Sequence, residues 1–158
     1  MGKTRWLQSL VLRGLWAGKG RERNCDQSAL IQNKKMYRTL SIAELNTAYS
    51  MGQTTPSEVI DGVLKAALEF DDEKTWIYRV PDEELHERAR ALVDKHSKDL
   101  PLYGIPFAVK DNIDVAGLPT TAGCPGFSYT PEKSASVVEL LIEAGAILIG
   151  KTNLDQFA

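Results

Sequence analysis

A lysine at the end of an apolar run is the first residue in this chain whose type and position suggest chemistry. The run 105–109 has the length of a strand and leads directly into Lys110, after which Asp111 and Asn112 begin a turn. Open α/β sheets bind ligands beside the carboxyl ends of their strands. A strand buried on both faces would present Lys110 to the loops at that edge. The spacing alone leaves two interpretations open, a reactive lysine and a lysine that keeps the strand end soluble.

Other polar side chains are weaker candidates for catalysis. His86 and His96 are ten residues apart on one predicted helix and do not share a face, so they do not suggest a metal site. Cys124 lies in a long loop and could act as a thiol nucleophile, but no histidine is placed to serve as its base. Asp111 and Asp114 are interpreted as turn residues in preference to an acid/base pair. We predict no metal ion and no cofactor.

The segment 145–152 matches the phosphate-loop pattern, in which two spaced glycines are followed by lysine and threonine. A phosphate loop needs flexible residues between its glycines, because consecutive backbone amides must turn toward an anion. Here those positions read Ala-Ile-Leu-Ile, which favours a strand, and a predicted helix precedes them. We therefore interpret 145–152 as a strand followed by a turn and not as a nucleotide site.

The elements that position Lys110 follow from regular helix and strand signals after Met36. Two capping boxes, Ser41 to Glu44 and Thr55 to Glu58, begin the first two helices. The predicted helices are 41–52, 55–70, 82–96 and 134–144, with a further helix start at 153–156, and the predicted strands are 76–80, 105–110 and 146–149. Strand, helix and strand in this order predict a right-handed βαβ crossover with parallel strands. The expected fold class is α/β, with N-terminal helices followed by a βαβ unit of a mixed sheet.

Two of these helices carry an apolar stripe at helical spacing. The residues predicted to be buried are Val59, Ile60, Val63, Leu64, Ala67 and Leu68 on the helix 55–70, and Leu85, Ala89, Leu92 and Val93 on the helix 82–96. The segment 111–131, which follows Lys110, is rich in Gly, Pro and Thr. Loops of this length in a compact domain are usually functional.

Charge divides the chain into a basic N-terminal extension, 1–35, and a domain, 36–158. The extension carries eight Lys/Arg against two acids, a net of +6, and the remainder carries eleven against nineteen, a net of -8. An acidic body argues against a nucleic-acid partner. Apolar residues at helical spacing make the extension compatible with a mitochondrial presequence, a membrane-surface helix, or a segment outside a native protein that begins at Met36.

Cysteine usage and hydropathy indicate the cellular compartment in which we expect the protein. The two cysteines, Cys25 and Cys124, are too few for a disulfide framework and have no CxxC spacing, which is typical of reduced thiols in a cytoplasmic protein. No apolar run is long enough to cross a bilayer, so we do not expect a membrane partner.

Three motifs in the second half resemble the amidase signature family. They are Gly-Ile-Pro-Phe-Ala-Val-Lys-Asp-Asn-Ile (104–113), Gly-Leu-Pro-Thr-Thr-Ala-Gly (117–123) and Glu-Ala-Gly-Ala-Ile-Leu-Ile-Gly-Lys-Thr-Asn (143–153). Within that family, 124–131 and 153–158 look most like allophanate hydrolases. The resemblance implies a Ser-cisSer-Lys mechanism, in which a serine attacks an amide carbonyl, a second serine relays its proton and a neutral lysine accepts it. By resemblance, Lys110 is that lysine.

The resemblance also implies what is missing. In the family both serines lie in Gly- and Ser-rich sequence beyond the region that matches 153–158, and no such stretch occurs in this chain. We therefore expect an incomplete amidase signature fold that is inactive alone, from a parent that converts allophanate and water to ammonia and carbon dioxide. One alternative is a glutamyl-tRNA amidotransferase A-type subunit, although such relatives more often have Glu at the position of Gln156. Another is a non-catalytic fragment that binds a partner.

The expected partner of the parent enzyme is a small-molecule amide. In this chain, the strand 146–149 would leave an apolar face and an edge uncovered. We therefore expect poor solubility, a homodimer, or association with the missing C-terminal part.

Overall fold

The computed structural model describes residues 41–69, 74–93, 95 and 99–158. Its helices are α3 (Ile42–Ser50), α4 (Pro56–Glu69), α5 (Asp82–Arg90) and α6 (Ser136–Glu143), with a 3-10 turn η2 (Pro125–Phe127), and its strands are β1 (Trp76–Arg79), β2 (Pro106–Lys110) and β3 (Ile147–Thr152). The predictions for residues 1–35 and for His96 fall outside the described residues. The α/β class is confirmed, as is the order of N-terminal helices before a βαβ unit.

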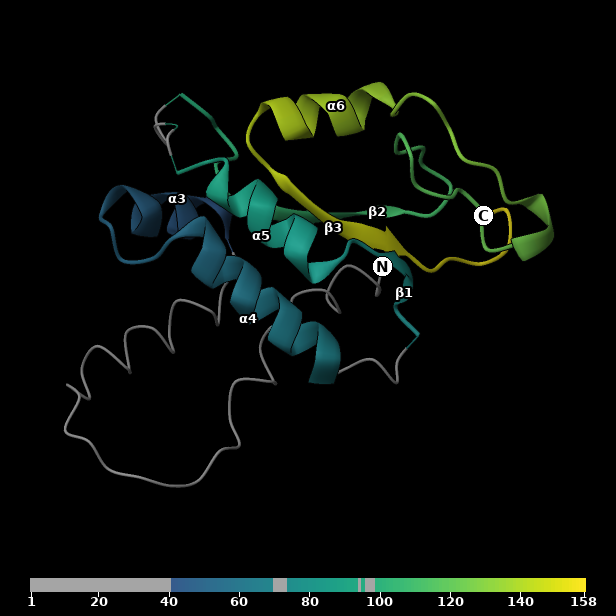
Figure 1. Ribbon diagram of the computed structural model, residues 1–158, viewed down its shortest axis with the longest axis horizontal. Helices are drawn as coiled ribbons and strands as arrows, with labels where there is room; N and C mark the ends of the chain where they lie inside the picture. The colour runs from purple at the N-terminus through teal and green to yellow at the C-terminus, as the bar shows by residue number, and fades with distance from the viewer. Residues whose placement is uncertain (1–40, 70–73, 94, 96–98) are drawn as a thin grey trace.

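The three strands form one mixed sheet in the order β1-β3-β2. The central strand β3 runs parallel to β2 and antiparallel to β1. The parallel crossover from β2 through α6 to β3 is confirmed (Figure 1). In the β2–β3 register Lys110 is opposite Thr152 and Val109 is opposite Lys151. Both strands therefore end at the same edge of the sheet, and the loops and the described chain end gather there (Figure 1).

Both predicted capping boxes begin helices. The Ser41 hydroxyl accepts a hydrogen bond from the Glu44 amide at 3.2 Å, at the start of α3. At the start of α4, the Thr55 hydroxyl accepts from the Glu58 amide at 3.3 Å, and the Glu58 carboxylate accepts from the Thr55 amide at 2.9 Å. These contacts satisfy amides that have no partner within the first helical turn.

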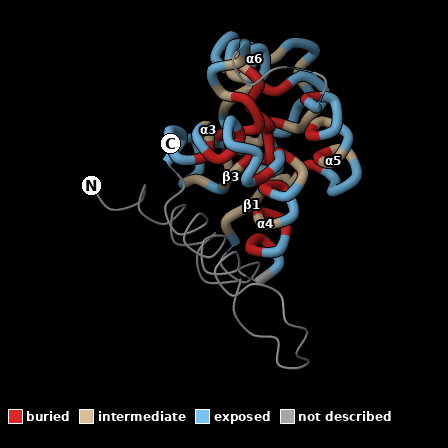
Figure 2. Tube along the Cα trace, turned by 90° about the vertical axis from the view of Figure 1, so that its left-hand side faces the viewer, coloured by how far each residue is buried: buried red, intermediate tan, exposed pale blue. Residues whose placement is uncertain are grey.

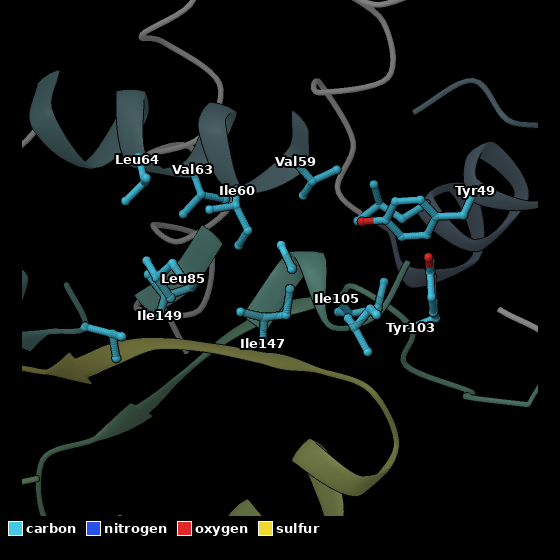
Figure 3. Packing of buried hydrophobic residues seen from close by; sticks show 14 residues of the cluster. Tyr49, Val59, Ile60, Val63, Leu64, Leu85, Tyr103, Ile105, Ile147 and Ile149 are labelled. Atoms are coloured by element: carbon cyan, nitrogen blue, oxygen red, sulfur yellow. The ribbon is translucent and has the colours of Figure 1, made fainter. Parts of the chain in front are cut away.

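Helices cover both faces of the sheet (Figure 1). Side chains alternate along β3, so Ile147 and Ile149 pack with α4 and α5, whereas Leu148 packs with Val138 of α6. Figure 3 shows the α4 side chains directed toward Ile147 and Ile149. The buried residues concentrate around the central strand (Figure 2).

Glycine at position 150 allows β1 to approach β3. A Cβ built on Gly150 would overlap the main-chain oxygen of Tyr78 on the neighbouring strand. A larger residue here would separate the two strands, because no flexible side chain is available to move aside. Gly150, one of the two glycines of the phosphate-loop pattern, thus allows the two strands to pack closely. The strand predicted within 145–152 is confirmed, but in place of the predicted turn after it β3 continues to Thr152.

Several predicted boundaries are wrong. The helix predicted for 82–96 ends at Arg90 and continues as a turn over 91–93. No helix begins at 153–156, where the chain makes a bend and a turn. β3 extends two polar residues past Gly150, because its hydrogen bonds to β1 and β2 continue to Thr152. The helix predicted for 134–144 spans Ser136–Glu143.

Some predicted burial is also wrong. Leu68 and Val93 are each 65% exposed, although most members of their predicted stripes are buried. Leu68 lies near the end of α4, and Val93 lies past the end of α5, so neither faces the sheet. β2 is not buried on both faces, since only Val109 among its residues is buried. No helix in the described part of the chain is long and apolar enough to span a membrane.

Candidate active site

Lys110 lies at the last position of β2 and its side chain is exposed. Its Nζ donates a hydrogen bond to the main-chain oxygen of Ala158 at 2.7 Å. Asn112 Nδ2 donates to the same oxygen at 3.0 Å. Two polar side chains, one from the end of β2 and one from the turn after it, therefore converge on one acceptor. The sequence predicted that Lys110 would be presented to the loops at this edge of the sheet, and its side chain is open to solvent there.

A second lysine, Lys151, is fully buried next to this strand end. It lies on β3, where its side chain is 0% exposed. Its Nζ donates to Pro119 O and to Thr120 Oγ1, both at 2.7 Å, and lies 3.3 Å from Asp111 Oδ1. Two of the three hydrogen bonds that an ammonium group can donate go to these neutral oxygens, and the contact with Asp111 Oδ1 is an ion pair without hydrogen-bond geometry. The buried charge is therefore paired and hydrogen-bonded.

Asp111 supplies the opposite charge and is also 0% exposed. Its Oδ2 accepts hydrogen bonds from the Thr121 amide, at 3.0 Å, and from the Thr121 hydroxyl. Burial by itself raises the pKa of Asp111, but the two Thr121 hydrogen bonds and the charge of Lys151 outweigh burial and hold that pKa below its ordinary value near 3.8. The side chain is therefore a carboxylate at neutral pH.

The long loop after β2 is anchored by further polar contacts. Thr120 Oγ1 donates to Asp114 Oδ1 at 2.9 Å, and the Tyr129 hydroxyl donates to the same oxygen at 2.8 Å. Thr120 and Tyr129 also pair through their backbones. The hydrogen bond to Asp114 raises the pKa of Tyr129, because it stabilises the protonated phenol. Thr120 thus connects this group of contacts to Lys151.

The segment after β3, 153–158, is hydrogen-bonded first to the residue before β1 and then to the long loop after β2. The Asn153 amide donates to Thr75 O at 2.8 Å, and the Phe157 amide donates to Ala122 O at 2.9 Å. Ala122 and Phe157 have positive φ angles of 50° and 54°, so both residues hold a left-handed conformation that is unfavourable for a residue with a side chain. The Phe157 ring contacts Phe127 edge to face, with centroids 5.3 Å apart. These contacts hold Ala158 in front of Lys110.

The residues that the sequence suggested as candidates for catalysis do not form one cluster in the structure. Lys110 lies at the sheet edge where the loops meet, as expected. Asp111 and Asp114 do not pair with each other, and each instead anchors part of the loop. Cys124 is a free, partly buried thiol. His86 Nε2 lies 3.5 Å from Asp61 Oδ1.

No group of three or more His, Cys, Asp or Glu side chains in the described residues is arranged to hold a metal ion. The Lys151–Asp111 pair was not among the contacts predicted from sequence. The available signal was a lysine directly after the apolar run of β3, within a segment otherwise typical of a buried strand.

Comparisons with known proteins place these features in a family. The family model described as Amidase matches residues 58–158. The chain is 58% identical over 87 residues to the urea amidolyase of Saccharomyces cerevisiae, which covers 54% of this chain and 5% of that protein. It is 35% identical over 124 residues to the A-type subunit of the glutamyl-tRNA(Gln) amidotransferase from Methanosarcina acetivorans, covering 78% of this chain and 25% of that protein. The structure matches Kluyveromyces lactis allophanate hydrolase with a TM-score of 0.61 and 45% identity, over 75% of this chain and 20% of the other.

Proposed function

The chain belongs to the amidase family, and from this membership we propose that it forms the N-terminal part of a cytoplasmic allophanate hydrolase in which Lys110 is the catalytic base. The reaction of the parent would convert allophanate and water to ammonia and carbon dioxide. The observation that carries the proposal is the position of Lys110, an accessible amine at the carboxyl end of a parallel strand. The 58% identity to a urea amidolyase and the 45% identity to an allophanate hydrolase support the substrate.

The hydrogen bond of Lys110 suits a base. A neutral lysine has two N–H groups and one lone pair. One N–H bound to the Ala158 oxygen would aim the nitrogen, and the lone pair would remain available to accept the proton that a serine loses when it attacks the amide carbonyl. Lysines act as bases where burial or neighbouring donors disfavour the ammonium form. Because Lys110 is exposed in this chain, that burial would come from other parts of the enzyme.

We propose that the chain is inactive alone. Among the described serines, none is hydrogen-bonded to Lys110, and Ser134 instead accepts a hydrogen bond from the Ala116 amide at 2.9 Å. The chain spans only a twentieth to a quarter of the relatives named above, so the activity belongs to a longer enzyme. The base would then be present without a nucleophile beside it.

A chimera tests the function directly. Residues 41–158 would replace the matching segment of Kluyveromyces lactis allophanate hydrolase, and ammonia release from allophanate would be measured for the chimera and for this chain alone. We expect the chimera to release ammonia and the isolated chain to release none above buffer. A folded chimera without activity would contradict the proposal, as would hydrolysis by the isolated chain. The unaltered Kluyveromyces lactis enzyme is the reference.

The same assay decides between two amidase functions. The match to the amidotransferase covers 78% of this chain, a larger share than the urea amidolyase match, and this favours a glutamine-hydrolysing function as the second candidate. A chimera with the remainder of the amidotransferase polypeptide that hydrolyses glutamine, alongside an inactive allophanate chimera, would support that function. If neither chimera hydrolysed its substrate, the non-catalytic alternative of partner binding would be favoured.

The outer face of α6 supports an association with another polypeptide. Val137, Leu140 and Ile142 of this short helix are 53%, 65% and 45% exposed, and Val137 and Leu140, three residues apart, lie on the same side of it. We propose that this apolar face is covered by the remainder of the amidase domain in the parent and leads to self-association of the isolated chain.

Sedimentation velocity of the isolated chain is expected to show dimers or larger species, and the substitution Leu140→Lys is expected to reduce their amount. Val93→Lys, at an equally exposed single position, is the matched control and should change nothing. A monomeric unmodified chain would contradict the proposal.

A further inference from the structure

We propose that Asp111 and Lys151 are positioning residues that fix both ends of the contact between Lys110 and Ala158. The proposal rests on the function assigned above to Lys110. Both charged side chains are 0% exposed, and the distance between Lys151 Nζ and Asp111 Oδ1 is 3.3 Å. Neither residue is hydrogen-bonded to the oxygen that Lys110 contacts, so they would act through other groups.

The donor end of the contact is fixed through the backbone. Asp111 directly follows Lys110, and its amide donates to Thr152 O at 3.1 Å, which extends the pairing of β2 with β3 by one residue. Its carboxylate is held by Lys151 from the neighbouring strand and by Thr121 from the loop. The backbone that carries Lys110 is therefore held from both the strand and the loop.

The acceptor end is fixed through the loop. Thr121 donates both its amide and its hydroxyl to Asp111, and the next residue, Ala122, accepts a hydrogen bond from the Phe157 amide. Phe157 is followed by Ala158, whose oxygen contacts Lys110. A short path of hydrogen bonds thus leads from the Asp111 carboxylate to the acceptor of the Lys110 amine. Lys151 supports the same path from the neighbouring strand, because its Nζ also binds Pro119 O and Thr120 Oγ1.

Stability alone does not account for a buried pair of this kind. Replacing a buried ion pair by apolar residues of similar volume is often neutral or stabilising, since the desolvation of two charges offsets their attraction. A carboxylate and an ammonium do, however, require defined partners at defined distances. Here those partners come from the turn directly after β2, from β3 and from the loop at 119–121, and together they hold in register the elements that bring Lys110 and Ala158 together.

Competitive acylation of lysines with acetic anhydride, followed by mass spectrometry, measures this positioning in the intact chain without any hydrolysis assay. The labelling rate of Lys110 would be followed from pH 7 to pH 10 and divided by that of Lys133, an exposed lysine in the segment before α6. Lys65 on α4 is a second exposed reference. Lys151 should stay unlabelled in the native chain because it is fully buried, which reports that the protein is folded.

Two variants separate positioning from a merely structural role. Asp111→Leu/Lys151→Met removes both charges and the bonds to Thr121, leaving no buried charge without a partner. Thr121→Val removes one hydrogen bond to Asp111 and changes no charge. Because losing a charge-assisted hydrogen bond costs on the order of 1 kcal/mol, we expect the relative labelling rate of Lys110 to rise roughly three- to tenfold in the double variant. A smaller rise in the same direction is expected for Thr121→Val.

The outcomes are decisive because Thr121→Val does not depend on the double variant folding. An unchanged profile of Lys110 against Lys133 in Thr121→Val overturns the proposal, whatever the double variant does. A folded double variant with a Lys110 profile like that of the native chain also overturns it, since the pair would then contribute only to packing. Failure of the proposed function has a different signature. In that case the allophanate chimera is inactive, while the labelling of Lys110 still responds to both variants.

Discussion

Replacing Lys110 by alanine is expected to lower ammonia release by the allophanate hydrolase chimera by about 10²- to 10⁴-fold, the usual contribution of a positioned general base. The methyl group of alanine cannot accept the proton that the serine must lose. Because groups that act as one catalytic unit are not additive, the loss could match that of removing the nucleophile itself. The measurement is kcat/KM for allophanate, from initial rates of ammonia release.

Because Lys110 is exposed, its replacement should affect catalysis without destabilising the fold. Its side chain lies at the surface and makes one hydrogen bond, to a main-chain oxygen, so its removal should change the free energy of unfolding by no more than about 0.5–1 kcal/mol. Lys133→Ala is the control, because that side chain is also exposed and is not part of the contact between Lys110 and Ala158. Near-normal kcat/KM in a folded Lys110→Ala chimera would exclude this lysine as the base.

Much of the fold could be predicted because its signals are local. The capping boxes at Ser41 and Thr55 place a hydrogen-bonding side chain within four residues of its partner, and helix starts followed from them. The apolar runs before Lys110 and Lys151 likewise indicated strands of the right type. Helix ends were less predictable. The residues after Arg90 have helical composition, yet the helix stops there and the chain turns.

In the candidate site, too, local features could be predicted from the sequence and long-range contacts could not. Lys110 was identifiable because its position depends on one strand and the turn after it. The partnership of Lys151 with Asp111 was not, because it joins residues forty positions apart that meet only when β2 and β3 pair. The contact of Lys110 with Ala158 depends on a bend at 153–158 where sequence had suggested a helix. Short-range patterns therefore singled out Lys110 as a candidate residue, whereas the contacts around it depend on pairing between distant segments.

The largest expected change in stability follows from removing one member of the buried pair. Lys151→Met leaves the Asp111 carboxylate buried without its cation, and breaking a buried pair in this way typically costs about 3–5 kcal/mol. Urea unfolding at pH 7, followed by circular dichroism, would measure it. The double variant Asp111→Leu/Lys151→Met should recover most of the loss, since no uncompensated charge remains. A single variant as stable as the native chain would show that the pair contributes nothing to stability.

The dependence of this loss on pH tests whether Asp111 is the cause. In the native chain the pKa of Asp111 lies below its ordinary value near 3.8, so its stabilising contribution is complete above that value and disappears as the pH falls through the lower, folded-state pKa. Without Lys151 the pKa of Asp111 rises from its native value, because a charge that lowered it is gone, so the penalty of the buried carboxylate is relieved as acid protonates it. The difference in unfolding free energy between native chain and Lys151→Met should therefore be largest near pH 7 and shrink toward pH 4. A difference that is constant over this range would assign the effect to lost packing of the lysine side chain, because packing does not titrate.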